Sequence, residues 1–245
     1  VSAGSSATIA VITIFALPVP FVAIPLLALA GGVTAGAVVV LTMSRVGDPI
    51  RLILMGISVN ALLYALIITV TSLGDQNSVG LLYLYLLGSI ANRTWDYVNI
   101  ILPWAVIAIP AALLMARPLN LLQLGDEVAE GMGLRVTRIR LLIALIAAGL
   151  VAGVVAVCGP IAFVALVAPH ITRRALNTTD ARVVLPLSAL AGATLLLGAD
   201  VLAKNLFDPM ELPVGIWTTV LGGPLLLLML RRQLGADNRQ GGSRA

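Results

Sequence analysis

Apolar runs long enough to cross a membrane recur along almost the whole chain, and they leave room for little other than a bundle of membrane helices. A helical crossing of the hydrocarbon core needs about 20 apolar residues. Of all residues 60% are hydrophobic and 11% are charged, and the mean hydropathy is +1.06, far outside the range of soluble globular domains. We predict an all-α, polytopic membrane bundle with eight crossings, several of them short or broken. The windows that meet or approach the required length lie at about 4–17, 19–43, 50–72, 96–116, 136–157, 160–173, 181–203 and 214–230.

Two stretches do not fit a crossing. Residues 79–90 are apolar but too short to span, and they end in Gly-Ser, so we predict a re-entrant or surface helix there. Residues 234–245 are polar and glycine-rich, and we predict a C-terminal tail outside the membrane. Residues 1–233 are therefore expected to form one transmembrane domain.

The distribution of basic residues predicts the orientation of the chain. If the loop at 44–49 is cytoplasmic, 13 of the 15 Lys and Arg residues are cytoplasmic, and only Arg93 and Lys204 lie outside. Cytoplasmic loops of membrane proteins carry an excess of positive charge, so this orientation is strongly favoured over its reverse. The basic balance reflects membrane sidedness, and the scattered arginines form no basic helix that would bind nucleic acid.

The cytoplasmic loop 117–140 differs from a plain connector. Asn120 is placed to cap a short helix, Asp126 is placed to cap a second one, and Gly131 and Gly133 are placed to end it. We predict two short amphipathic helices that serve as a docking element. The alternative is a pair of helices lying passively on lipid. Against it, the acidic side chains of the second helix would be repelled by an anionic leaflet.

Proline and glycine interrupt the last membrane segment. Residues 205–215 contain two prolines, and the following stretch ends in Gly-Gly-Pro, so we predict a short helix before the final crossing. Broken helices at membrane depth are tolerated mainly where they are buried in protein or line a water-filled path. A kink needed only for packing is an equally good interpretation.

Residues able to carry out chemistry are scarce. His170 is the only histidine, and it lies between Pro169 and Arg173 at the cytoplasmic end of a predicted helix. No second ligand stands at metal-binding spacing, so we favour a structural role for His170 over metal binding or proton relay. Asp200 is the sole carboxylate deep in a predicted crossing, and Lys204 stands one turn later, where the two can pair. An intramembrane acid raises the alternative of a proton-coupled secondary carrier, and a passive channel is a third possibility. The sequence holds no Walker, GxSxG or HExxH motif, so no catalytic residue is predicted.

Several segments in order along the chain carry a family resemblance. They are VSAGSSA at the start, LILMGISVNALL at 52–63, LYLLGSIANRTW at 84–95, LNLLQLGDEVAEGMGL at 119–134, GPIAFVALVAPHITRR at 159–174, LPLSALAGATLLLGADVLAK at 185–204 and ELPVGIWTTVLGGPLLLLMLRR at 211–232. These segments resemble those of the bacterial FecCD-type permeases, the membrane subunits of type II ABC importers for ferric siderophores, haem and cobalamin. The family resemblance implies a ten-helix bundle, so we expect two further helices before residue 1.

The resemblance also assigns roles to residues. Residues 120–133 match coupling helices that insert into a cleft of an ATPase subunit. Lys204 stands where similar permeases carry a basic residue that pairs with a glutamate of an extracytoplasmic binding protein. The implied ATPase contacts are Leu122, Gly125, Asp126, Glu127, Ala129 and Gly133. The small or neutral polar residues expected along the translocation path are Gly56, Ser58, Asn60, Ser89, Thr218 and Thr219.

From this resemblance we expect a multi-pass permease subunit of the bacterial cytoplasmic membrane. It would import a ferric siderophore by alternating access, with cobalamin or haem as alternative substrates. The implied partners are a second permease subunit, two ATPase subunits, an extracytoplasmic substrate-binding protein and membrane lipid, with no nucleic acid. No cofactor is expected in this chain, because ATP and magnesium would bind to the ATPase. The chain itself is not expected to be an enzyme.

Overall fold

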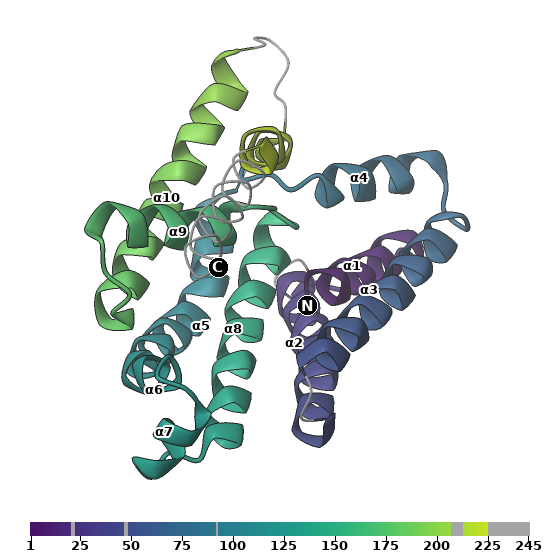
Figure 1. Ribbon diagram of the computed structural model, residues 1–245. Coiled ribbons are helices and arrows are strands. Elements are labelled where there is room, and N and C mark those ends of the chain that lie inside the picture. Colours follow the sequence, from purple (N-terminus) through teal and green to yellow (C-terminus); the bar gives the residue numbers. More distant parts are fainter. Residues whose placement is uncertain (21–22, 47–48, 92, 207–212, 225–245) are drawn as a thin grey trace, which may run out of the picture. The chain divides into compact units, whose positions relative to one another are not determined.

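The computed structural model describes residues 1–20, 23–46, 49–91, 93–206 and 213–224, with the backbone alone for 42–46 and 49–53. Within these ranges the chain is helical and contains no strand, which confirms the predicted all-α class (Figure 1). The helices are α1 Ser2–Ile14, α2 Ala23–Val46, α3 Pro49–Thr71, α4 Gln76–Leu86, α5 Trp95–Leu114, α6 Ala116–Leu122, α7 Asp126–Gly131, α8 Val136–Cys158, α9 Val164–Leu176 and α10 Ala181–Asn205, and residues 214–224 are also helical.

Five of the expected crossings are helices long and apolar enough to span a membrane within the described ranges. They cover Ala23–Leu41, Leu54–Thr71, Trp95–Leu122, Val136–Cys158 and Ala181–Asn205. The windows at 4–17 and 160–173 form shorter helices, α1 and α9, of 13 residues each. The eighth window, 214–230, is helical as far as 224, and its remainder lies outside the described residues, as does the polar tail at 234–245.

The described helices fall into two compact units. The first contains Val1–Pro160 together with Asp180–Arg182, and the second contains Ile161–Thr179 and the chain from Val183 onward. Helix α10 therefore begins in the first unit and continues in the second. The boundary expected at residue 233 lies outside the described part of the chain.

Small residues allow the helices of the first unit to approach closely. Gly32 and Gly36 on α2 face Ala152 and Ala148 on α8, and a Cβ atom added at either glycine would lie 2.8 Å from the opposing alanine Cβ. Helices in membranes associate largely through such small-residue contacts, because lipid is as apolar as their side chains. The buried core nearby is formed mainly by α1, α2, α3 and α4, with Ala7, Ile9, Ala10, Ala28, Ile67, Val70, Leu82 and Ala156.

The short helix expected near 79–90 is confirmed as α4, with 11 residues. Its end is joined to the end of α8: the Tyr85 hydroxyl donates to the Val155 carbonyl, and the Ser89 N–H donates to the Cys158 carbonyl at 2.8 Å. Gly159 follows directly, with φ of +74° and ψ of 179°. Any Cβ there would collide with the Tyr85 carbonyl oxygen, so only glycine fits this junction.

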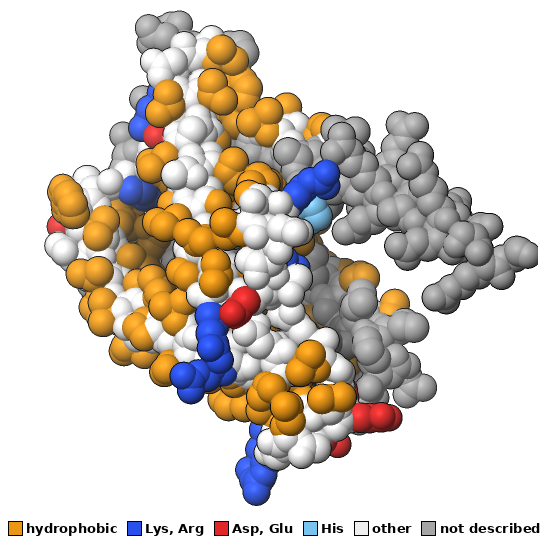
Figure 2. Space-filling view, turned by 60° about the vertical axis from the view of Figure 1, so that its left-hand side comes forward, with side chains coloured by type: hydrophobic (Ala, Val, Ile, Leu, Met, Phe, Trp, Pro, Cys, Tyr) orange, Lys and Arg blue, Asp and Glu red, His pale blue; other side chains and the backbone are white. Residues whose placement is uncertain are grey.

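Large apolar side chains cover much of the described surface. Leu62, Ile107, Leu114 and Leu190 are each more than 60% exposed within the chain. Figure 2 shows hydrophobic side chains spread over the visible face, with few charged groups among them. Exposed apolar area on this scale is typical of surfaces covered by lipid or by partner subunits.

Candidate functional site

Helices α6 and α7 are joined by a turn that requires glycine. Gly125 has φ of +103° and ψ of 158°, a conformation that side chains with a Cβ rarely adopt. Helix α7 ends as the sequence predicted, with Gly133 at φ of +83°. The Leu134 N–H donates to the Ala129 carbonyl at 3.0 Å and the Gly133 N–H to the Glu130 carbonyl at 2.8 Å, which is the Schellman pattern. The predicted pair of short helices is therefore present, but Asp126 is the first residue of α7, and Gly125 occupies the cap position expected for Asp126.

The side chains of α7 divide into buried and exposed sets. Ala129 has no exposed surface, so its side chain packs within the chain, and the ATPase contact implied for this residue stays a prediction. Glu127 and Asp126 are exposed, and Leu122 is partly buried. Three apolar side chains at four-residue spacing are exposed on this segment: Leu124 at 59%, Val128 at 49% and Met132 at 60%. This stripe, Leu124–Val128–Met132, offers an apolar contact surface that the implied contacts left out.

Asp126 has a partner within the chain. Arg140, near the start of α8, donates Nη1 to Asp126 Oδ2 at 2.9 Å and Nη2 to Oδ1 at 2.6 Å. The two side chains are 43% and 48% exposed, so the pair stabilises the fold by only about 0.5 kcal/mol, within the range of surface ion pairs. Its bidentate geometry fixes the orientation of α7 relative to α8. No local signal in the sequence marks this pair, because its members are 14 residues apart.

Asn120 does not cap its own helix as predicted, because α6 begins at Ala116 and holds Asn120 in its interior. Instead, the Asn120 Oδ1 accepts the backbone N–H of Ala181, the first residue of α10, at 2.7 Å. The Asn120 Nδ2 donates to Asp180 Oδ1 at 2.6 Å, and the Arg182 N–H donates to the same oxygen at 2.9 Å. The hydrogen bond from Asn120, followed by that from Arg182, holds the pKa of Asp180 below its usual range. An aspartate directly before a helix was the one signal of this cap available in the sequence.

Of the six residues expected along a translocation path, four lie in the first unit. Gly56 and Asn60 lie together on α3 and line an open groove with residues of α2 and α8. Ser58 is exposed, and its hydroxyl donates to the Leu54 carbonyl of its own helix at 2.9 Å. Ser89 is held at the α4–α8 junction, where its Oγ also accepts the Ala91 N–H.

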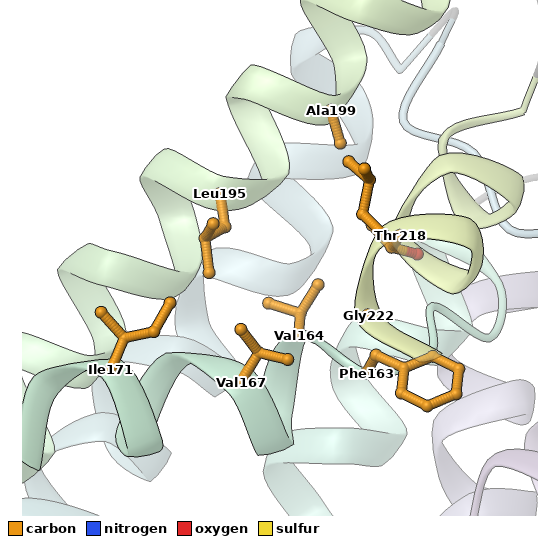
Figure 3. Close-up of a pocket in the computed structure, with 9 residues that line it drawn as sticks. Phe163, Val164, Val167, Ile171, Leu195, Ala199, Thr218 and Gly222 are labelled. Carbon is orange, nitrogen blue, oxygen red and sulfur yellow. The ribbon is translucent and has the colours of Figure 1, made fainter. Parts of the chain in front are cut away.

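The remaining two path residues lie in the second unit. Thr218 is buried and Thr219 is exposed, and both hydroxyls donate to the Gly215 carbonyl, at 3.1 and 2.7 Å. Thr218 lines an apolar cavity of about 90 Å³, where α9, α10 and helix 214–224 converge (Figure 3). Phe163 stands at its edge with φ of +67°, and a Cβ at Gly222 would collide with the Phe163 side chain.

The three residues expected at the cytoplasmic helix end lie on α9. Pro169 is inside the helix, His170 is partly buried and Arg173 is exposed in the last turn. A basic residue there complements the negative end of the helix dipole. No group of three or more His, Cys, Asp or Glu side chains within the described ranges is arranged to hold a metal ion. The structural role assigned to His170 stays a prediction.

Lys204 and Asp200 form the pair that their spacing predicted. Lys204 Nζ lies 2.8 Å from Asp200 Oδ2, with the lysine side chain 48% exposed and the aspartate 15% exposed. The ammonium group therefore compensates the charge of a nearly buried carboxylate while half of the lysine side chain stays accessible. The docking role implied for Lys204 is compatible with this exposure and stays a prediction.

Comparisons with known proteins place these features in a family. The FecCD transport family model matches residues 1–232. The chain is 40% identical over 210 residues to the iron(3+)-hydroxamate import system permease protein FhuG of Bacillus subtilis, covering 85% of this chain and 62% of FhuG. It is 38% identical over 246 residues to the hemin transport system permease protein HmuU of Yersinia pestis, covering 95% of this chain and 71% of HmuU.

A solved structure agrees in fold. A protein described as a metal-chelate type ABC transporter, in an inward-facing conformation, superposes with a TM-score of 0.86 at 26% identity, covering 94% of this chain and 73% of that one. The five membrane-length helices and this likeness define a multi-pass protein of the inner membrane. The chain belongs to the FecCD transport family.

Proposed function

We propose that this chain is a permease subunit of an ATP-binding-cassette importer that takes up a ferric siderophore by alternating access. The family match and the likeness to an iron(3+)-hydroxamate permease protein support the class and the substrate. The observation on which the proposal chiefly rests is the α6–α7 pair, whose exposed Leu124–Val128–Met132 stripe is suited to a cleft on another protein. Apolar side chains with charged neighbours at the rim are typical of a specific protein interface.

In this proposal the chain supplies the path and a separate subunit supplies the energy. ATP and magnesium bind to an ATPase pair, and this chain holds no cofactor and catalyses no reaction. ATP-driven closure of the ATPase moves α6 and α7, and the permease with a second permease subunit exchanges outward-open for inward-open states. An extracytoplasmic binding protein delivers the substrate and provides most of the selectivity.

The side chains available to a path fit a large, weakly held substrate. The groove at Gly56 and Asn60 is lined by small or apolar residues, and none of its described lining residues is charged. A bulky ferric complex can pass such a surface without strong binding, whereas small ions need a narrower and more polar filter. Haem is a second candidate, favoured by the 38% identity to HmuU over 95% of this chain.

The contacts of Asp200 argue against a proton-coupled carrier. Its carboxylate is 15% exposed and lies 2.8 Å from Lys204 Nζ. The carboxylate therefore has a charged partner within its own helix. A local ion pair is the simpler function of this intramembrane acid.

Reconstitution of the full-length importer tests the proposal. The permease, its ATPase and its binding protein are placed in liposomes, and uptake of radiolabelled ferric hydroxamate is measured with and without ATP, with haem in a parallel assay. We expect uptake only with ATP and the ATPase present. Uptake driven by a proton gradient in the absence of the ATPase would overturn the importer assignment. ATP-dependent uptake of haem without uptake of ferric hydroxamate would make haem the substrate in place of a ferric siderophore.

Charge reversal at Lys204 tests the docking role. We expect Lys204→Ala to weaken binding-protein association by roughly 1.5- to 5-fold, the range of an exposed ion pair, and Lys204→Glu to weaken it further through repulsion. The difference in affinity between each variant and the parent chain should become smaller as the salt concentration rises. Dissociation constants at low and high salt provide the measurement.

The matched control for this prediction removes a local effect. Because Lys204→Glu also places two carboxylates one turn apart, the same reversal is made in an Asp200→Asn background. If Lys204→Glu binds the partner as tightly as the parent chain at low salt in both backgrounds, Lys204 serves only the local pair.

A further inference from the structure

We propose that Asn120 is a positioning residue that connects coupling helix α6 to the start of α10, so that a displacement of α6 by the ATPase moves α10. This inference rests on the proposed function, because it gives the α6–α7 pair a defined route into a membrane-spanning helix. It is carried by the hydrogen bonds between Asn120, Asp180 and the first backbone amides of α10.

The cap of α10 is shared between two distant parts of the chain. The first N–H groups of a helix have no partner within it and must be satisfied from outside. Asp180, directly before α10, accepts the Arg182 N–H at 2.9 Å, whereas the Ala181 N–H is accepted by Asn120 Oδ1 at 2.7 Å. The amide nitrogen of Asn120, Nδ2, donates to Asp180 Oδ1 at 2.6 Å. The start of α10 is thus held by a side chain 61 residues earlier in the sequence.

Asparagine is suited to this place because it presents an acceptor and a donor on one planar group. The acceptor meets a backbone N–H and the donor meets an ionised carboxylate, and hydrogen bonds to charged groups are the stronger kind. Asn120 is partly buried, which limits competition from water. A residue with only one of these functions would leave either the Ala181 N–H or the Asp180 carboxylate without this contact.

The cap lies at the start of α10, where a displacement of α6 can be passed on to the rest of that helix. Residues Asp180–Arg182 group with the coupling helices in the first unit, and α10 continues from Val183 in the second. Pro186 lies one turn after the cap and has no N–H, so the Arg182 carbonyl cannot receive its usual helix bond. The first turn of α10 is therefore joined to the rest of the helix by fewer hydrogen bonds. A motion of α6 acts on this turn, and Pro186 allows it to bend.

A reciprocal exchange of side chains provides the test. In Asn120→Asp, two carboxylates meet across the 2.6 Å contact and the link breaks. In Asp180→Asn, the new amide oxygen still accepts from both the Arg182 N–H and Asn120, so this variant is the matched control. The double variant restores the link to position 120 with donor and acceptor exchanged: the new amide at position 180 donates to the new carboxylate at position 120, which still accepts the Ala181 N–H. The Arg182 N–H loses its acceptor in this variant, because the amide nitrogen takes the place of Asp180 Oδ1.

Two measurements on the full importer in lipid nanodiscs or liposomes follow these variants. Hydrogen exchange of the 181–182 amides reports the link itself. We expect roughly tenfold faster exchange in Asn120→Asp, near-parent exchange in Asp180→Asn and, in the double variant, recovery at Ala181 but not at Arg182. The number of ferric hydroxamate molecules transported per ATP hydrolysed reports coupling. We expect it to fall about tenfold in Asn120→Asp and to recover in the double variant, with ATPase association unchanged in all three.

The outcomes separate this inference from the proposed function. Unchanged exchange at 181–182 in Asn120→Asp overturns the link. Restored exchange at Ala181 without restored coupling in the double variant overturns the positioning role, as does a loss of ATPase association that accounts for the whole defect. If the parent importer shows no ATP-dependent transport, the proposed function fails, while the exchange data still decide whether the link exists.

Discussion

Substitution of Gly32 by leucine is expected to prevent the first unit from folding. A Cβ at this position would lie 2.8 Å from Ala152 Cβ and 3.3 Å from Ala152 Cα, and it would also collide with the Ser5 hydroxyl. The two alanine atoms belong to or sit directly on the α8 backbone, so only a shift of the whole helix could make room. Overpacking in a well-packed core costs on the order of 3 kcal/mol, and a leucine here adds three further carbon atoms. We expect little monodisperse protein after detergent extraction, measured by size-exclusion chromatography and thermal unfolding.

The control for this prediction is a glycine in open space. Gly198 on α10 has no other atom within 4 Å of its added Cβ, apart from its own helix and chain neighbours. Gly198→Ala should be neutral or raise stability by up to about 1 kcal/mol, because alanine is the better helix former. Gly32→Ala should instead lower the thermal midpoint. Equal midpoints for the two alanine variants would contradict the close contact of α2 with α8.

Introduction of a carboxylate into the middle of the α7 stripe is expected to abolish ATPase coupling. Val128 is 49% exposed between Leu124 and Met132, so Val128→Asp should leave the fold intact while it places a charge in the proposed contact. Burial of an unpaired polar group costs on the order of 2 kcal/mol or more, and a charge costs more. We expect ATPase association to weaken by at least roughly thirtyfold, measured by binding to the purified permease, with ATP-dependent uptake lost in parallel.

Two variants bracket this result. Val128→Ile keeps the apolar character and should bind the ATPase like the parent chain. Asp126→Asn removes the ion pair to Arg140 without adding a charge to the surface. ATPase binding by this variant therefore measures how far the orientation of α7 contributes to ATPase association. Tight ATPase binding by Val128→Asp would show that the Leu124–Val128–Met132 stripe faces lipid or a different partner.

Local features of this protein were predictable from the sequence where a short-range signal specifies them. The end of α7 follows from Gly133, which accepts a positive φ. The Lys204–Asp200 pair follows from a spacing of four residues on one helix. The short α4 helix follows from an apolar run too short to cross a membrane.

Other features depend on which helix faces which, and here the apolar pattern gives little information. In a soluble helix the apolar stripe marks the buried face, but α2, α3, α5 and α8 are apolar on every side, so lipid-facing and protein-facing positions look alike. In the same way, the sequence does not indicate that Ala129 is buried while its larger neighbours Val128 and Met132 are exposed.

The sequence by itself determined the all-α membrane class, five of the eight expected crossings and the glycine end of α7, because each depends on composition or on contacts within about one helical turn. The tertiary structure alone decided the long-range contacts: Gly32 against Ala152, Arg140 with Asp126, and Asn120 at the start of α10. A side chain such as Asn120 carries the same local helical signal whether it faces water, a lipid headgroup or another helix. Its partner is fixed only when packing brings residues 61 positions apart within hydrogen-bonding distance.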